Sequence, residues 1–412
     1  MKKNKLLLLI FAILGIAGCK KTTAPVDEDL YTGTVVVHAP QPVTKTVSKK
    51  IFSHVMPWFE SNTSNSGQWG QHWKMANKNP DIIDGSGKRQ IASHYYPMIG
   101  PYASGDVNVI EYQLLLMKLS GVDGVLLDWP GKMILNDYPF MVRNSERMID
   151  MLEKVGMTFA IVYEDRNLQD APGGNKIGQA QIDMNYLQNN YFNLSYYEKV
   201  DGKPWLLDFG PIQMQTPSDW TSIFSVLNPK PSFFTLWGES NEPGVNANGE
   251  YAWIYNLHNN HLSLLNNFYN KVYSGHKVAA VYPGFKDFYA EGGLGEVIGW
   301  EIDHNGTNTF NTTMDMALAS SCSSIQLCTW NDYGEGTMIE PTQEFGYGFL
   351  TSLQNKLGVS DLAQADLELI NTLYTKRKSF SSDTDKQKRL DQVFYYIVSL
   401  QMDKAKKLLN SI

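Results

Sequence analysis

Short apolar runs alternate with amphipathic segments along most of this chain. The runs are apolar almost throughout, which is typical of strands in a parallel sheet that is covered by helices on both faces. Between them, apolar residues recur at intervals of three and four, which predicts helices. Eight runs are predicted as strands, at residues 51–58, 91–99, 122–127, 158–162, 204–208, 232–236, 278–281 and 324–328.

The alternation of strands and helices indicates the fold class. Eight strand–helix units favour a single α/β domain, a (β/α)8 TIM-type barrel over residues 51–360. An open doubly wound sheet is the alternative, although no Gly-x-Gly-x-x-Gly motif follows the first strand to support a dinucleotide site. The helices between strands are predicted at residues 107–119, 141–155, 182–191, 220–227, 262–273 and 313–320.

The end of the chain has a purely helical pattern. A helix at residues 345–357 is expected to close the barrel. Two further amphipathic segments, at residues 362–377 and 385–409, carry no candidate chemistry. We therefore predict a C-terminal helical extension, residues 361–412, that packs on the outside of the barrel.

The first residues, 1–18, have the pattern of a secretion signal. Three lysines precede an apolar run at residues 6–14, which is too short for a comfortable transmembrane helix. A pair of small residues directly precedes Cys19, which resembles the lipoprotein processing box of bacteria, in which the cysteine becomes lipidated. An ordinary signal peptide with an incidental cysteine is the alternative. We expect a lipid-anchored protein of the bacterial cell envelope, at the outer membrane or cell surface, with residues 19–50 as lipidated cysteine and tether.

Composition and charge narrow the choice of partner. The formal net charge is −7, and loss of the leader lysines makes it more negative. No basic patch offsets repulsion from phosphates, so nucleic acid is not an expected partner. Aromatic residues make up 12% of the chain, which suits a carbohydrate cleft but is equally explained by a large core with tyrosines at its edge. No Cys/His cluster has zinc spacing, so no metal and no cofactor are expected, and we expect a monomer.

The densest candidate chemistry follows the last predicted strand, at residues 329–341. Asp332 and Glu335 are three positions apart, and Gly334 and Gly336 break any regular continuation, so the acids should lie on a loop. Hydrolysis of a glycosidic bond uses two carboxyl groups, one to protonate the leaving oxygen and one to drive attack at the anomeric carbon. A surface turn with solvated acids is the alternative interpretation.

Acidic and aromatic residues also follow the other predicted strands. Active sites of (β/α)8 barrels lie on the loops at the carboxyl ends of the strands. We therefore expect these side chains to converge on one rim and bind an oligo- or polysaccharide. The ordinary alternatives are a core histidine and carboxylates that cap helices. The predicted substrate-binding residues are His54, Trp58, Tyr95, Tyr96, Asp128, Trp129, Glu164, Trp237, Glu239, Tyr282, Trp330, Asn331 and Tyr333.

The loop after the last strand also resembles known families. Residues 330–335, Trp-Asn-Asp-Tyr-Gly-Glu, closely resemble the motif of glycoside hydrolase family 71, the α-1,3-glucanases. The longer stretch 331–341, with Gly-Glu-Gly-Thr and Ile-Glu-Pro, looks like glycoside hydrolase family 99, the endo-α-mannosidases. In family 99 the first catalytic position is Glu, whereas this chain has Asp332. The similarity extends over the presumed barrel, about residues 50–360.

The resemblance implies that Glu335 is the general acid and Asp332 the base. In the glucanase-like case Asp332 activates water and the anomeric configuration inverts. In the mannosidase-like case it deprotonates the 2-hydroxyl of the sugar, with net retention. Asp is one methylene shorter than Glu, which favours inversion. The expected protein is an endo-acting glycosidase for α-glucan or α-mannan. The alternatives are a non-catalytic glycan-binding lipoprotein on the same barrel and a saccharide-processing protein of envelope assembly.

Overall fold

The computed structural model describes residues 30–295 and 297–412. Within these ranges, eight parallel strands form a closed ring in the order β3-β2-β1-β9-β8-β7-β6-β5, which the pairing of β3 with β5 completes. A short strand, β4 (Lys199–Val200), pairs antiparallel with β5 and is not part of the ring. The expected (β/α)8 barrel is therefore confirmed. Its strands are β1 (Lys50–Val55), β2 (Gly124–Trp129), β3 (Thr158–Tyr163), β5 (Lys203–Asp208), β6 (Ser232–Leu236), β7 (Ala247–Tyr251), β8 (His276–Val281) and β9 (Ser324–Leu327).

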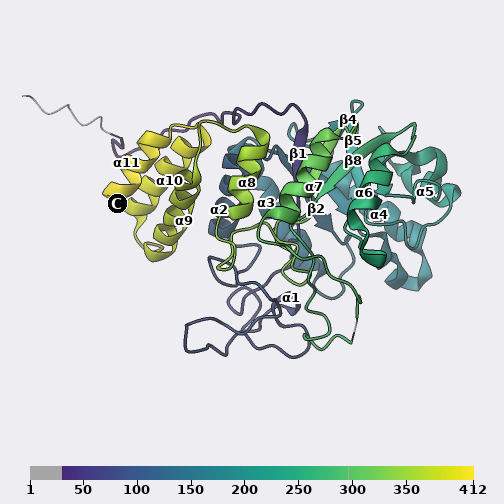
Figure 1. Ribbon diagram of the computed structural model, residues 1–412, viewed down its shortest axis with the longest axis horizontal. Helices are drawn as coiled ribbons and strands as arrows, with labels where there is room; N and C mark the ends of the chain where they lie inside the picture. The colour runs from purple at the N-terminus through teal and green to yellow at the C-terminus, as the bar shows by residue number, and fades with distance from the viewer. Residues whose placement is uncertain (1–29, 296) are drawn as a thin grey trace, which may run out of the picture.

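Helices surround the ring, as Figure 1 shows. The connection from β6 to β7 is the exception, since it holds a short 3-10 helix, Gly244–Asn246, in place of an α-helix. The surrounding helices are α2 (Val107–Leu119), α3 (Tyr138–Val155), α4 (Lys176–Asn190), α5 (Pro217–Ile223), α6 (His261–Asn270), α7 (Asn308–Ala319) and α8 (Gly348–Leu357).

Two strand predictions need correction. Residues 91–99 do not form a barrel strand; they belong to the long loop between β1 and α2, where Pro97 makes an isolated bridge to Thr342. The apolar residues of this segment pack into a second small core beneath that loop, which explains their strand-like pattern. The strand that completes the set of eight is β7, between β6 and β8. The prediction missed it because its sequence, Ala-Asn-Gly-Glu-Tyr, is not apolar. Parallel pairing with β6 and β8 on its two edges defines it.

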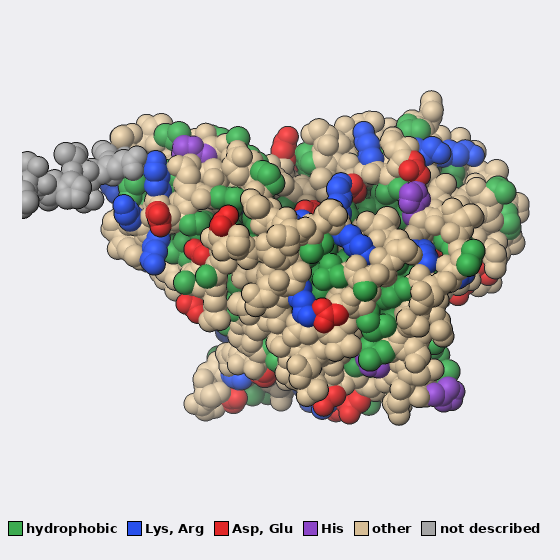
Figure 2. All heavy atoms as spheres, turned by 45° about the horizontal axis from the view of Figure 1, so that its top comes forward, with side chains coloured by type: hydrophobic (Ala, Val, Ile, Leu, Met, Phe, Trp, Pro, Cys, Tyr) green, Lys and Arg blue, Asp and Glu red, His purple; other side chains and the backbone are tan. Residues whose placement is uncertain are grey.

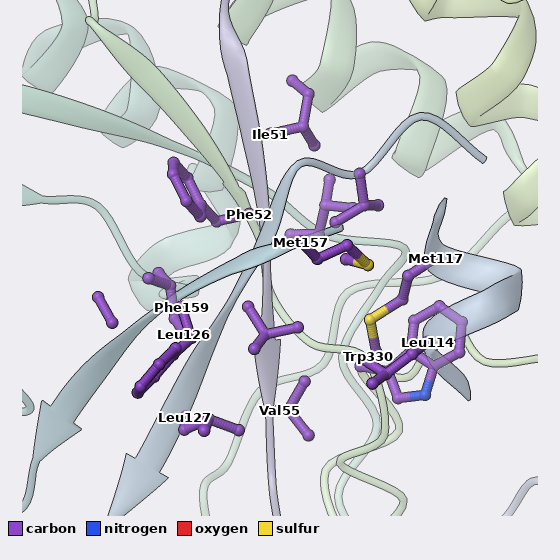
Figure 3. Close-up of a cluster of buried hydrophobic side chains, with 14 of the residues drawn as sticks. Ile51, Phe52, Val55, Leu114, Met117, Leu126, Leu127, Met157, Phe159 and Trp330 are labelled. Carbon is purple, nitrogen blue, oxygen red and sulfur yellow. The ribbon is translucent and has the colours of Figure 1, made fainter. Parts of the chain in front are cut away.

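The strand β1 illustrates how the barrel strands are buried on both faces. In Figure 3, Ile51 and Val55 lie on the side of β1 that faces Leu114 of α2, and Phe52 points to the other side. There its ring packs edge-on against Trp205, with ring centroids 5.1 Å apart. Both faces of the strand are therefore buried, and even its polar residues Ser53 and His54 are shielded from water.

The C-terminal extension packs beside α2, as predicted (Figure 1). It consists of α9 (Gln364–Ser379), α10 (Thr384–Val398) and α11 (Met402–Ser411). The single helix predicted at residues 385–409 is in fact α10 and α11, because the chain turns at Leu400, which has a φ of 59°. Arg377 of α9 forms a buried ion pair with Glu111 of α2, with Nη2 and Oε2 2.9 Å apart. This pair ties the extension to the barrel.

The described part of the expected tether, residues 30–49, is packed against the domain. The backbone N–H of Gln41, for example, donates to the carbonyl oxygen of Val398, at 2.9 Å. The predicted leader and Cys19 lie outside the described residues, so secretion and lipidation remain predictions. Among the residues that are described, no helix has the length and apolar character needed to cross a membrane.

Charges of both signs are mixed on the surface drawn in Figure 2. Lys and Arg side chains are interspersed with Asp and Glu, and apolar side chains reach the surface in small groups.

Candidate active site

The loop that follows β9 lies at the carboxyl end of the barrel. Figure 1 shows the long loops after β1, β8 and β9 gathered around the short helix α1 (Gln71–Lys74), below the barrel. The backbone N–H of Trp330 donates to the carbonyl oxygen of His54, at 2.7 Å. The Asn331 side chain bonds both backbone groups of Met56, accepting at 2.9 Å and donating at 3.0 Å. The loop is thereby fixed to the end of the neighbouring strand β1.

Asp332 is held in a buried position at the start of this loop. It is 4% exposed, and its Oδ1 accepts from the backbone N–H of Glu335 at 3.1 Å. Burial raises the pKa of Asp332 to about 6, although backbone hydrogen bonds and the charge of His72 act in the opposite direction. Asp332 is therefore mainly ionised at neutral pH.

Glu335 has the opposite protonation state. Its Oε1 accepts from the Tyr289 hydroxyl at 2.9 Å. Burial, and then the charge of Asp332, raise the pKa of Glu335 to about 8, while Tyr289 and Arg166 lower it. One loop therefore presents a carboxylate and a carboxylic acid three positions apart, which is the pairing that acid–base hydrolysis needs.

A second pair of acids comes from the neighbouring strands. Asp128 belongs to β2 and Glu164 follows β3, and their carboxyl groups share a hydrogen bond, which requires a proton on one of them. Burial and then Glu164 raise the pKa of Asp128. Arg166 donates to Glu164, with Nε and Oε2 2.9 Å apart, and its own pKa is raised by Glu164, Asp128 and Glu335. Asp332 also influences Asp128, so the structure brings these predicted site residues together in one electrostatic cluster.

The predicted substrate-binding residues with aromatic side chains divide into a partly exposed group and a buried group. Trp58, Tyr95 and Tyr96 are partly exposed on the long loop after β1. Trp58 stacks on His72, with ring centroids 4.3 Å apart and an interplanar angle of 8°. The Tyr95 ring lies beside Gly336 of the loop after β9, 2.9 Å from where a Cβ would stand. The three rings therefore lie on the long loop after β1, which borders the loop after β9.

The remaining predicted contacts at the ends of β1, β2, β8 and β9 are buried. Their observed contacts are structural, because residues at strand ends still belong to the packed layers of the barrel. Their role in substrate binding stays a prediction. The Tyr282 hydroxyl, for example, bonds His261 at 2.9 Å. The buried residues are His54, Trp129, Tyr282, Trp330, Asn331 and Tyr333.

Glu340 anchors the far end of the loop after β9. Its carboxylate is buried and accepts from the hydroxyls of Tyr102 and Tyr333, at 2.8 and 2.9 Å, and from Gln113 at 2.8 Å. Burial raises its pKa to about 7. Since all three partners are also buried or part of the loop itself, Glu340 holds the loop rather than reaching a substrate.

The loop after β6 contributes less than the sequence suggested. Trp237 is partly buried and packs against Phe268, with ring centroids 5.7 Å apart. Burial raises the pKa of Glu239, and its charged neighbours are Glu242 and Glu250. These contacts do not join Trp237 or Glu239 to the cluster of Asp128, Glu164, Asp332 and Glu335.

Three residues of the site were not among the sequence predictions. Arg166 directly follows the acids at the end of β3, so its charge was a usable signal. His72 and Tyr289 lie in long loops without any pattern that points to Asp332 or Glu335. In the part of the chain that the structure describes, no group of three or more His, Cys, Asp or Glu side chains is arranged to hold a metal ion.

Comparison with known proteins places the fold. No family model and no curated protein matches the chain. A GH99 endo-alpha-mannosidase from Bacteroides thetaiotaomicron, solved with BIS-TRIS-propane, superposes with a TM-score of 0.57 and 18% identity over 89% of this chain and 100% of its own. A second structure of such an enzyme from the same organism gives 0.57 and 19%, over 84% and 99%. A glycoside hydrolase-like protein gives 0.56 and 12%, over 78% and 98%. The expected resemblance to family 99 is confirmed as a shared barrel fold.

Proposed function

We propose that the protein is a glycosidase that cleaves an α-linked oligo- or polysaccharide, with Glu335 as general acid and Asp332 as base. The observation that carries the proposal is the opposed protonation of these two groups on one loop at the carboxyl end of the barrel. The fold shared with GH99 endo-alpha-mannosidases supports a carbohydrate substrate. The lipid anchor, the envelope location, the monomeric state and endo action are further parts of this proposal.

In the proposed reaction, Glu335 and Asp332 carry out both proton transfers, and a water molecule is the nucleophile. Glu335 gives its proton to the glycosidic oxygen as the bond to the anomeric carbon breaks. A water molecule attacks that carbon and gives its proton to Asp332. Asp332 ends protonated and Glu335 ionised, and proton exchange with solvent restores the starting state. Attack by water inverts the anomeric configuration, whereas attack by the 2-hydroxyl of the sugar, deprotonated by Asp332, leads to retention. We favour inversion because the side chain of Asp is short.

Hydrolysis of α-linked gluco- and manno-oligosaccharides, with NMR detection of the first anomer formed, tests the proposal. Glu335→Gln and Asp332→Asn should each reduce kcat by about 100-fold or more while binding, measured by calorimetry, persists. Asp315→Asn is the control, since Asp315 is exposed on α7 and pairs there with Lys356. If the wild-type protein binds these sugars but cleaves none of them, the proposal of glycosidase activity is wrong. The protein would then be a glycan-binding protein.

A further inference from the structure

A cavity of about 530 Å³ opens between the loop after β1 and the start of α3. Trp58, Trp69 and Phe140 give it aromatic walls, and the carboxyl groups of Glu60 and Asp137 belong to its lining. Its size and mixture of flat apolar faces with a few polar groups are typical of a small-molecule site. None of the four acids Asp128, Glu164, Asp332 and Glu335 is among the lining residues.

The cavity lies next to the loop after β9 that carries Asp332 and Glu335. His72 of α1 lines it and also influences the charge state of Asp332. Directly after α1, the Cε of Met75 lies 3.3 Å from where a Cβ of Gly334 would stand. Because His72 and Met75 both approach the loop that carries Asp332 and Glu335, a ligand in the cavity would adjoin the reacting bond on the Asp332 side.

Two polar atoms of the lining residues are buried without a partner. Glu60 has 2% of its side chain exposed, and its Oε1 accepts from Arg143 at 2.6 Å and from Asn144 at 2.8 Å. Its Oε2 has no hydrogen-bond partner, and neither has the Nε1–H of Trp58. An unsatisfied buried acceptor or donor costs free energy. A hydroxyl group can donate to the first and accept from the second.

The charges around the cavity favour a neutral ligand. Arg143 neutralises Glu60, and His72 pairs with Asp137, with Nε2 and Oδ2 3.1 Å apart. The guanidinium of Arg143 also lies over the Phe140 ring, 4.7 Å from its centroid. Since the carboxyl groups of Glu60 and Asp137 each already have a partner, a cationic ligand would gain little, whereas the hydroxyls and apolar ring faces of a sugar match the lining.

We propose that this cavity is a subsite for a sugar unit next to the one whose bond is cleaved, with one hydroxyl donating to Glu60 and another accepting from Trp58. The proposal rests on the proposed function for the position of the cleaved bond. It adds Glu60 as a specificity-determining residue that recognises chain length, since only a substrate long enough to reach the cavity gains these hydrogen bonds.

Calorimetry with sugars of two lengths tests the subsite. The probes are α-linked manno- and gluco-tetrasaccharides and the matching disaccharides, bound to protein that carries Glu335→Gln. Adding Glu60→Gln or Trp58→Phe should weaken tetrasaccharide binding by about tenfold and leave disaccharide binding unchanged. Glu198→Gln is the matched control, because Glu198 is also buried and ion-paired, with Lys50, but lies at the amino end of the barrel. Trp58→Phe keeps the Glu60–Arg143 pair and so serves if Glu60→Gln lowers the Tm.

The outcomes separate this proposal from the proposed function. Variants that affect both sugar lengths equally, or neither, overturn the subsite, and hydrolysis by the wild type would then still support the enzyme. Length-selective loss of binding without hydrolysis by the wild type supports the subsite and contradicts the enzyme. Failure of the protein to bind any of the four sugars overturns both.

Discussion

The activity of this protein should follow a bell-shaped pH profile between two carboxyl groups. Turnover needs Asp332 ionised, with a pKa of about 6, and Glu335 protonated, with a pKa of about 8. At pH 7 about nine-tenths of each group is in the required form, so about four-fifths of the molecules are productive. With the ordinary value of 4.5, only about 0.3% of Glu335 would carry its proton at that pH. Burial of the loop therefore increases the productive fraction about 300-fold.

Activity should fall on both the acid and the alkaline side of the pH optimum, and each decrease has its own cause. Below pH 6 Asp332 gains a proton and can no longer act as a base, so kcat/KM should fall about ninefold between pH 7 and pH 5. Above pH 8 Glu335 loses its proton and can no longer act as an acid, so kcat/KM should fall about ninefold between pH 7 and pH 9. Because Asp332 and Glu335 interact, the two apparent pKa values of the profile describe the pair and not either residue by itself.

Initial rates at substrate concentrations well below KM measure this profile, in buffers of constant ionic strength and with circular dichroism to confirm folding. Tyr289→Phe provides an internal check. Its hydroxyl lowers the pKa of Glu335, so the variant should move the alkaline limb to higher pH and leave the acid limb in place. An alkaline limb near the ordinary pKa of a glutamate, or a Tyr289→Phe profile shifted only on its acid side, would refute the assignment of roles.

Two further predictions concern stability. Gly336 has a φ of +66°, and a Cβ there would lie 2.7 Å from a backbone carbonyl oxygen, so Gly336→Ala should lower the free energy of unfolding by about 1–3 kcal/mol and abolish hydrolysis. Gly306→Ala has a similar φ but open space, and an equal loss of activity there would contradict the steric reasoning; urea titration and rate assays measure both. Arg377→Met leaves the buried Glu111 unpaired and should cost about 3–5 kcal/mol in urea titrations without changing kcat. Arg389→Met, which breaks an exposed pair, should cost about 0.5 kcal/mol or less, and equal costs would show that burial is not the cause.

The barrel fold, most of its strands and the position of the acid pair after the last strand could be predicted from the sequence. All but one of the predicted strands overlap strands of the ring, because most strands that are covered on both faces are largely apolar. Asp332 and Glu335 follow the last of these runs, and glycines beside them exclude a regular element. Chain order and barrel geometry then require this loop to lie at the carboxyl end.

Other features depend on contacts between distant segments, and only the tertiary structure decided them. The strand β7 is polar in sequence and exists because β6 and β8 pair with its two edges. Trp330 and Tyr333 look like exposed platforms beside the acids, yet both are buried. Tyr289 reaches Glu335 across 46 positions of the chain. Local patterns record which residues avoid water, whereas pairing, burial at strand ends and the pKa of a carboxyl group are set by neighbours that the chain brings together only when it folds.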